Sequence, residues 1–104
     1  MSKDVRLTKF EINAIISCFH EFFNSEDTIW LFGSRADMSK RGGDIDLYIQ
    51  TSIKDHREAY DKKCDFSIKL QDLIGEQKID IVLDLGMQDL LIYKVAKETG
   101  VRLV

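Results

Sequence analysis

The chain has 104 residues, of which 15 are Lys or Arg and 18 are Asp or Glu, so its formal net charge is −3. This length suits one hydrophobic core, and we expect a single domain over residues 1–104. The charge argues against a long basic face for nucleic acid, and no apolar run is long enough to span a bilayer. We therefore expect a cytoplasmic protein whose partners are neither nucleic acid nor a membrane.

The first predicted helix begins at a capping box, in which Thr8 and Glu11 each satisfy a main-chain donor of the other. Apolar residues then recur at helical spacing, and we expect this helix to end near Asn24. The β-branched and aromatic run at residues 28–32 predicts a buried strand, which Gly33 ends.

A polar link follows, with a helical turn expected around residues 36–39 and a flexible corner at residues 42–43, which are both glycine. Apolar alternation then predicts a second strand over Asp44–Gln50. The next long helix is expected to start near Asp55 and to end at Gly75, because a glycine commonly follows the last turn of a helix.

Clean alternation over Lys78–Asp84 predicts a third strand. Asp84, at the far end of this strand, is interpreted as a surface or turn carboxylate. The apolar pattern of residues 87–95 predicts a last helix that Gly100 closes, and residues 101–104 could add a short edge strand.

This order of elements predicts an α/β or α+β fold, with a small mixed β-sheet and helices over one face. The link between the first two strands is too short for a crossover, so we expect antiparallel pairing, whereas the helix before the third strand permits parallel pairing. These pairings would bring Ser34 near Asp44, and Asp80 beside Asp46. Polar side chains from three strands would then meet at one end of the sheet.

The chemistry of this cluster points to a phosphate substrate with a metal ion. Asp44 and Asp46 leave their strand on the same face because they are two positions apart. With Asp80 they could flank two metal ions about 3.5 to 4 Å apart. Magnesium prefers such oxygen ligands, and Gly33 and Ser34 would let main-chain amides approach a phosphate. The cluster therefore suits a magnesium-bound polyphosphate.

Three basic residues, Arg35, Lys40 and Arg41, follow the Gly-Ser pair. We expect at least one of them to contact the triphosphate or its pyrophosphate leaving group. An Asp-x-Asp pair at the start of a strand is, on its own, more often exposed to solvent than bound to metal. The Gly-Ser pair before it and the later strand aspartate favour the metal site.

The two cysteines, Cys18 and Cys64, are far apart in the sequence and lack the spacing of a zinc or redox motif. We expect both to be buried, reduced thiols.

Three motifs occur in order along the chain: Leu-Phe-Gly-Ser-Arg-Ala at 31–36, Gly-Asp-Ile-Asp-Leu at 43–47, and Lys-Ile-Asp-Ile-Val at 78–82. Together they resemble the polymerase-beta-like nucleotidyltransferases, and within them the minimal, stand-alone nucleotidyltransferases related to the kanamycin nucleotidyltransferase domain. The resemblance extends over most of the chain through the order of helices and the closing turn at residues 98–101.

The resemblance implies that Gly33 and Ser34 hold the nucleotide phosphates, with Arg35 beside them. It also implies that the catalytic and metal-binding residues are Asp44, Asp46 and Asp80, the last completing the metal site or acting as base toward the acceptor. Members of this family transfer a nucleoside monophosphate, usually AMP from ATP, to a hydroxyl, with Mg²⁺. Many minimal members act as the antitoxin of a helical HEPN-family protein, some by adding AMP to a tyrosine of that partner.

Two other functions remain open at this level. The chain could neutralise its partner by binding alone, without catalysis. It could also be a small-molecule nucleotidyltransferase that forms a homo-oligomer or relies on a separate helical subunit to hold the acceptor.

Overall fold

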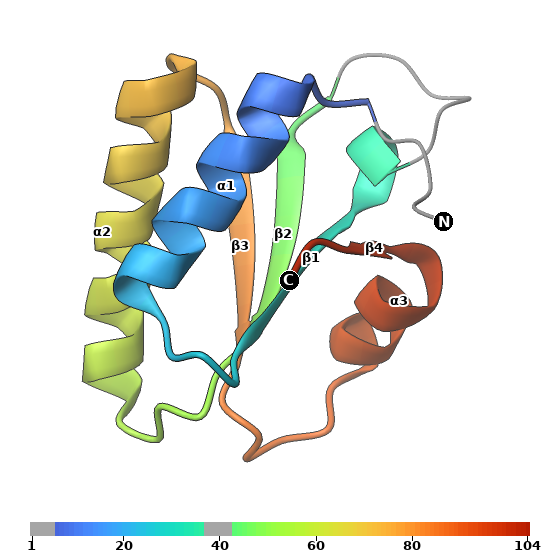
Figure 1. The fold of residues 1–104 in the computed structure, drawn as a ribbon. Coiled ribbons are helices and arrows are strands. Elements are labelled where there is room, and N and C mark those ends of the chain that lie inside the picture. Colours follow the sequence, from blue (N-terminus) through green and yellow to red (C-terminus); the bar gives the residue numbers. More distant parts are fainter. Residues whose placement is uncertain (1–5, 37–42) are drawn as a thin grey trace.

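The computed structural model describes residues 6–36 and 43–104, and every structural statement below concerns these residues. Within them the chain forms helices and strands in an alternating order (Figure 1). The elements are α1 (Lys9–Phe22), β1 (Thr28–Phe32), the short 3₁₀ helix η1 (Gly33–Ala36), β2 (Ile45–Gln50), α2 (His56–Ile74), β3 (Ile79–Asp84), α3 (Leu91–Thr99) and β4 (Val101–Arg102).

The four described strands form one mixed sheet in the order β3-β2-β1-β4. β1 pairs antiparallel with both β2 and β4, whereas β2 pairs parallel with β3. These are the pairings that the link lengths predicted. The register places Phe32 opposite Asp46 and Asp46 opposite Asp80, so the predicted meeting of Asp46 and Asp80 is confirmed at the level of the backbone.

The helices α1 and α2 cover one face of the sheet, as expected (Figure 1). The capping box of α1 is present: Thr8 Oγ1 accepts from the Glu11 amide at 3.0 Å, and Glu11 Oε1 accepts from the Thr8 amide at 2.8 Å. Alternate strand residues point into this layer and form most of the core with the two helices. They include Ile29, Leu31, Ile45, Leu47 and Ile49, which pack with Ile15, Phe19, Phe66 and Leu70.

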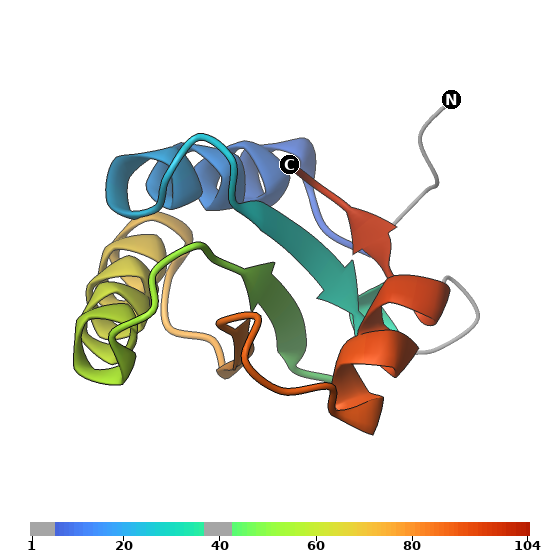
Figure 2. The ribbon, with the colours of Figure 1, turned by 90° about the horizontal axis from the view of Figure 1, so that it is seen from below.

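The third helix, α3, packs on the opposite face, which corrects the expectation that all helices lie on one side (Figure 2). The reason is Tyr48, which alternates with the core residues of β2 and therefore points away from α1 and α2. Its ring is fully buried, and the ring of Tyr93 from α3 lies 5.6 Å from it. The helix begins at Leu91 rather than at Met87.

Asp84 is also different from its predicted role as a surface or turn carboxylate. It is only 6% exposed. One carboxylate oxygen accepts from the Tyr48 hydroxyl at 2.5 Å, and the other accepts from the Gly86 amide at 2.8 Å. A carboxylate can be buried when such donors replace its water, and neither donor was evident from the strand pattern.

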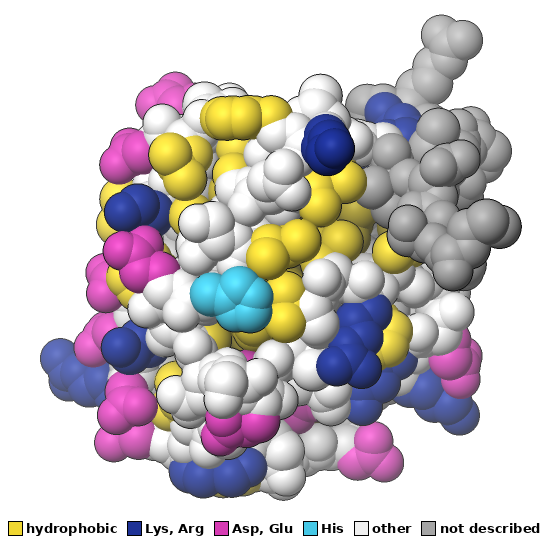
Figure 3. Space-filling view, viewed as in Figure 1, with side chains coloured by type: hydrophobic (Ala, Val, Ile, Leu, Met, Phe, Trp, Pro, Cys, Tyr) yellow, Lys and Arg dark blue, Asp and Glu magenta, His cyan; other side chains and the backbone are white. Residues whose placement is uncertain are grey.

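Other expectations are refined by the structure. The helical turn after β1 is η1, which starts at Gly33 and so begins before residues 36–39. Cys18 is buried, whereas Cys64 is half-buried on α2. In the described ranges, no helix combines the length and apolar composition needed to cross a bilayer. Figure 3 shows acidic and basic side chains mixed along the α2 edge, with hydrophobic side chains gathered nearer α1.

Candidate active site

Gly33 ends β1 with a backbone φ of +73°, a conformation that favours glycine. Its α-carbon faces Asp46 on the neighbouring strand. A Cβ added at this position would overlap the Oδ2 atom of Asp46. The glycine is therefore needed both for the turn and for the close approach of the Asp46 carboxylate to the backbone at the end of β1.

The three predicted aspartates lie at one end of the sheet, where β2 and β3 begin. Asp46 and Asp80 are register partners on adjacent parallel strands, and Asp44 directly precedes β2. Partial burial, with the nearby charges of Asp80 and Asp44, raises the pKa of Asp46, while Lys78 acts in the opposite direction. Burial is the largest cause of the raised pKa, and repulsion from the two neighbouring carboxylates adds to it.

Lys78 was not among the predicted site residues, yet it lies within the cluster. Its ammonium group is 3.5 Å from a carboxylate oxygen of Asp44. The Lys78 carbonyl also accepts from the Ile45 amide at 3.0 Å, which fixes the start of β3 against β2. Its position two residues before Asp80 was the one sequence signal that could have identified it.

Arg35 makes contacts that the sequence did not predict. Its Nε donates to the Gly43 carbonyl at 3.2 Å, and its Nη1 donates to the Arg6 carbonyl at 3.0 Å. The Arg35 carbonyl in turn accepts from the Arg6 amide at 2.7 Å. The guanidinium thus connects η1 to the residue just before Asp44 and helps to position the start of the aspartate segment.

The predicted site residues are therefore described to different extents. Gly33, Arg35 and the three aspartates are placed, whereas for Ser34 only the main chain is described, in η1. Lys40 and Arg41 lie outside the described residues. Their predicted contacts with phosphate stay predictions.

The aspartates do not form a finished metal site in the described structure. Over residues 6–36 and 43–104, no three His, Cys, Asp or Glu side chains are grouped closely enough to hold a metal ion. The donor set nevertheless fits magnesium, because all three side chains offer hard oxygen ligands and two of them are direct neighbours across the sheet. The mutual repulsion at Asp46 and the Lys78 ammonium at Asp44 both mark a place that attracts a cation.

A cleft of about 530 Å³ lies elsewhere, at the other end of β3. Its lining includes Leu83, Leu85, Met87 and Tyr93, with His56 at the start of α2. None of the three aspartates lines it. Its apolar lining lacks grouped carboxylates. The candidate active site is therefore the aspartate cluster and not this cleft.

A comparison with known protein families shows to which family the chain belongs. The family model described as Polymerase beta, Nucleotidyltransferase matches residues 13–104. The chain belongs to this family. The match spans all four described strands and includes Gly33 and the three aspartates. No curated protein matches the chain in sequence.

Membership of the polymerase beta nucleotidyltransferase family makes the chain a transferase of nucleotidyl groups at the general level. The mixed sheet with its three described helices agrees with this domain.

Proposed function

We propose that this nucleotidyltransferase moves AMP from ATP, with Mg²⁺, to a hydroxyl on a HEPN-type partner protein and thereby acts as the antitoxin of that partner. The observation that carries the proposal is the placement of Asp46. Its carboxylate lies against Gly33 at the end of β1 and beside Asp80 on β3. The partner class and the antitoxin role come from the motif resemblance.

The roles of the residues follow from what nucleotidyl transfer needs. Two magnesium ions, when bound, would neutralise the triphosphate and align the attacking oxygen with the leaving pyrophosphate. Asp44 and Asp46 would hold these ions together with Asp80. The absence of a side chain at Gly33 would let a phosphate lie close to the backbone. Asp80 is the most exposed of the three aspartates, so it is also the one that an acceptor hydroxyl could reach and to which it could give its proton.

A protein acceptor is supported by an apolar surface near α3. Five large apolar side chains in the segment 87–95 are exposed, among them Leu91 at 75% and Met87 at 49%. The others are Leu90, Ile92 and Val95. Exposed apolar side chains gathered in this way are typical of a protein-binding surface. Because α3 lies on the face of the sheet that carries Asp46 and Tyr48, a partner bound there would be on the same side as the aspartates.

The direct test mixes the pure chain with labelled ATP, Mg²⁺ and the protein encoded by the adjacent reading frame. We expect mass spectrometry to find one added AMP on a hydroxyl residue of that protein. Asp46→Asn should abolish the addition, and the matched control Asp72→Asn, at an exposed position of α2, should leave it unchanged. Absence of an adduct with every nucleoside triphosphate would contradict the proposal.

A second candidate, neutralisation by binding alone, is favoured by the same apolar surface. This surface contains none of the three aspartates, so the chain could bind its partner through it without catalysis. The double substitution Asp44→Asn with Asp46→Asn separates the two functions. If growth of cells that carry the partner is still protected, binding suffices; if protection is lost while the complex still forms, the transfer reaction is required.

A further inference from the structure

The strand β3 is an outer edge of the sheet in the described part of the chain. Proteins usually protect such edges with short strands, lysine, proline or bulges, because unpaired main-chain groups attract another strand. The other edge, β4, is only two residues long. β3 is six residues long and reads Ile-Asp-Ile-Val-Leu-Asp, without lysine or proline, and of its two charged residues Asp84 is buried. It therefore offers a template for pairing.

The direction of the main-chain groups on β3 can be read from its bonds to β2. The carbonyls of Lys78 and Asp84 accept from amides at either end of β2. The main-chain N–H and C=O groups of even-numbered residues on β3 therefore point toward β2. The main-chain groups of odd-numbered residues then point outward, away from the sheet. The Tyr93 hydroxyl donates to the Leu83 carbonyl at 3.1 Å, as this alternation requires, and the carbonyl keeps a second lone pair for an incoming amide. The outward groups of Ile79 and Ile81 lie farther along.

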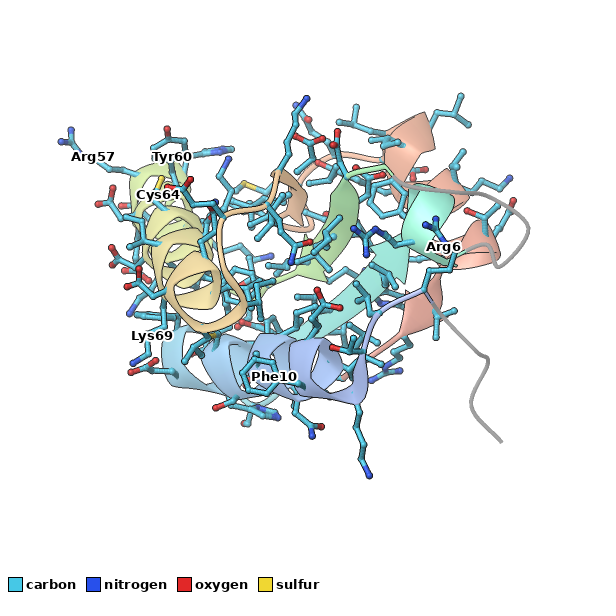
Figure 4. All side chains as sticks on the ribbon, turned by 90° about the horizontal axis from the view of Figure 1, so that it is seen from above. Arg6, Phe10, Arg57, Tyr60, Cys64 and Lys69 are labelled. Carbon is cyan, nitrogen blue, oxygen red and sulfur yellow. The ribbon has the colours of Figure 1, made fainter. Side chains whose placement is uncertain are left out.

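The helix α2 adds an apolar stripe above this edge. Tyr60, Cys64 and Ile68 are four residues apart and so lie along one side of the helix. They line a groove of about 330 Å³ between α2 and β3, together with Ile79 and Ile81 and the polar residues Lys63 and Ser67. Tyr60 is 56% and Ile68 is 63% exposed. Figure 4 shows Tyr60 and Cys64 together on α2.

We propose that a second copy of this chain covers the edge, with the two β3 strands paired antiparallel about a two-fold axis at Ile81. The two sheets would then continue into one eight-stranded sheet. In this register Asp80 lies opposite Val82 of the second copy, and Lys78 lies opposite its Asp84. The two nearest registers that use the same outward groups place Asp80 opposite another aspartate, which costs free energy. Charge therefore selects the register centred on Ile81.

The helix layer has the same centre of symmetry. Cys64 and Ile81 line the same groove, so an axis through Ile81 also passes near Cys64. Because Tyr60 and Ile68 are each four residues from Cys64, Tyr60 of one copy meets Ile68 of the other. Such a self-complementary patch is what a two-fold dimer needs. The pairing would bury the exposed apolar side chains of both helices and does not depend on the proposed catalytic function.

The cysteines provide a test on the unmodified chain. Cys64 would lie next to Cys64 of the second copy, whereas Cys18 is 1% exposed in the core. We expect a short bis-maleimide to produce a covalent dimer from the native chain and from Cys18→Ser, but not from Cys64→Ser. Sedimentation should give twice the 12.0 kDa of one chain. A monomer throughout the accessible concentration range, or cross-linking that does not need Cys64, would overturn the proposal.

A matched pair of substitutions tests the surface itself. Ile68 and Phe10 are both 63% exposed, but Phe10 lies on α1 and does not line the groove (Figure 4). Ile68→Glu should convert the dimer to a monomer, while Phe10→Glu should leave it dimeric, with both variants folded by circular dichroism. Ile81→Pro is a second probe and should also give a monomer, since it removes an outward amide rather than one bonded to β2. If Ile68→Glu remains dimeric, the interface is elsewhere and the proposal is wrong.

Discussion

Gly33 and Asp46 are in direct contact across β1 and β2, with a carboxylate oxygen of Asp46 in the space that a side chain at residue 33 would need. The contact ties the end of one strand to the acidic group that opens the next. A change at Gly33 therefore affects the site as well as the fold.

We expect Gly33→Ala to lose most nucleotidyl transfer and also to lower stability. The positive φ alone costs a non-glycine residue about 1 to 2 kcal/mol, and the new Cβ would also displace Asp46. Gly75→Ala is the matched control, because Gly75 has a φ of +90° but no atom of the described residues lies within 4 Å of the added Cβ. Urea unfolding and transfer assays on both variants check this prediction. Equal activity in the two variants would mean that the Asp46 contact is not needed for transfer.

Substitution of Asp46 should separate stability from activity. Asp46→Asn removes a charge that Asp80 and Asp44 repel, so the thermal midpoint should stay the same or rise. Transfer should fall at least about 100-fold, since a bound metal ion contributes several kcal/mol of charge stabilisation. Residues at functional sites commonly lower the stability of the fold while they support activity.

The effect of Mg²⁺ on the thermal midpoint tests the same site independently. If the aspartates bind the ion, Mg²⁺ should raise the thermal midpoint of the native chain, and EDTA should reverse the rise, because a ligand that binds the folded state stabilises it. Asp46→Asn should show a much smaller rise. Identical Mg²⁺ responses in the two proteins would place the metal elsewhere.

The sequence predicted much of the sheet because alternation and link length are strong signals. The antiparallel and parallel pairings, and with them the Asp46 to Asp80 register, follow from these two features. The same alternation puts Tyr48 on the face of β2 that carries Asp46, since the two residues are two positions apart. It could not show that Tyr48 is buried, because burial depends on Tyr93, which lies 45 positions later in the chain.

The roles of Asp84 and Arg35 were not predictable for a related reason. Asp84 is buried because the Tyr48 hydroxyl and the Gly86 amide donate to it, and no local pattern reports a partner as distant in the chain as Tyr48. Arg35 was expected to contact phosphate from its charge and position. The structure adds contacts of its guanidinium with two main-chain carbonyls, which a sequence does not show because every residue carries a carbonyl.

Arg35→Lys tests whether the shape of this side chain matters more than its charge. Lysine keeps the charge but cannot donate to the Gly43 and Arg6 carbonyls from a planar fork. If Arg35 positions the segment that leads to Asp44, Arg35→Lys should lower kcat by on the order of 10- to 100-fold, nearly as much as Arg35→Ala. If Arg35 acts mainly as a charge on phosphate, lysine should restore most of the activity that alanine loses. Steady-state kinetics with ATP distinguishes these outcomes.

The buried pair of Tyr48 and Asp84 predicts how stability depends on pH. Burial, together with the hydrogen bond to Asp84 and its charge, raises the pKa of Tyr48 above the ordinary value of 10.0. A group whose pKa is higher in the folded state stabilises the fold fully below its unfolded pKa and loses this contribution as pH rises. The free energy of unfolding should therefore decrease as pH increases beyond 10.0. Tyr93, with a pKa raised by burial and by Asp84, adds to the same trend.

Tyr48→Phe should reduce this alkaline slope. At neutral pH it should also lower stability by about 1.5 to 3 kcal/mol, the usual contribution of a hydrogen bond to a charged group, since Asp84 loses the Tyr48 hydroxyl. Urea unfolding of both proteins at a series of pH values from neutral to alkaline measures the slope and the offset together. Parallel curves would show that Tyr48 keeps an ordinary pKa, and an unchanged neutral stability would show that the hydroxyl is not needed to keep Asp84 buried.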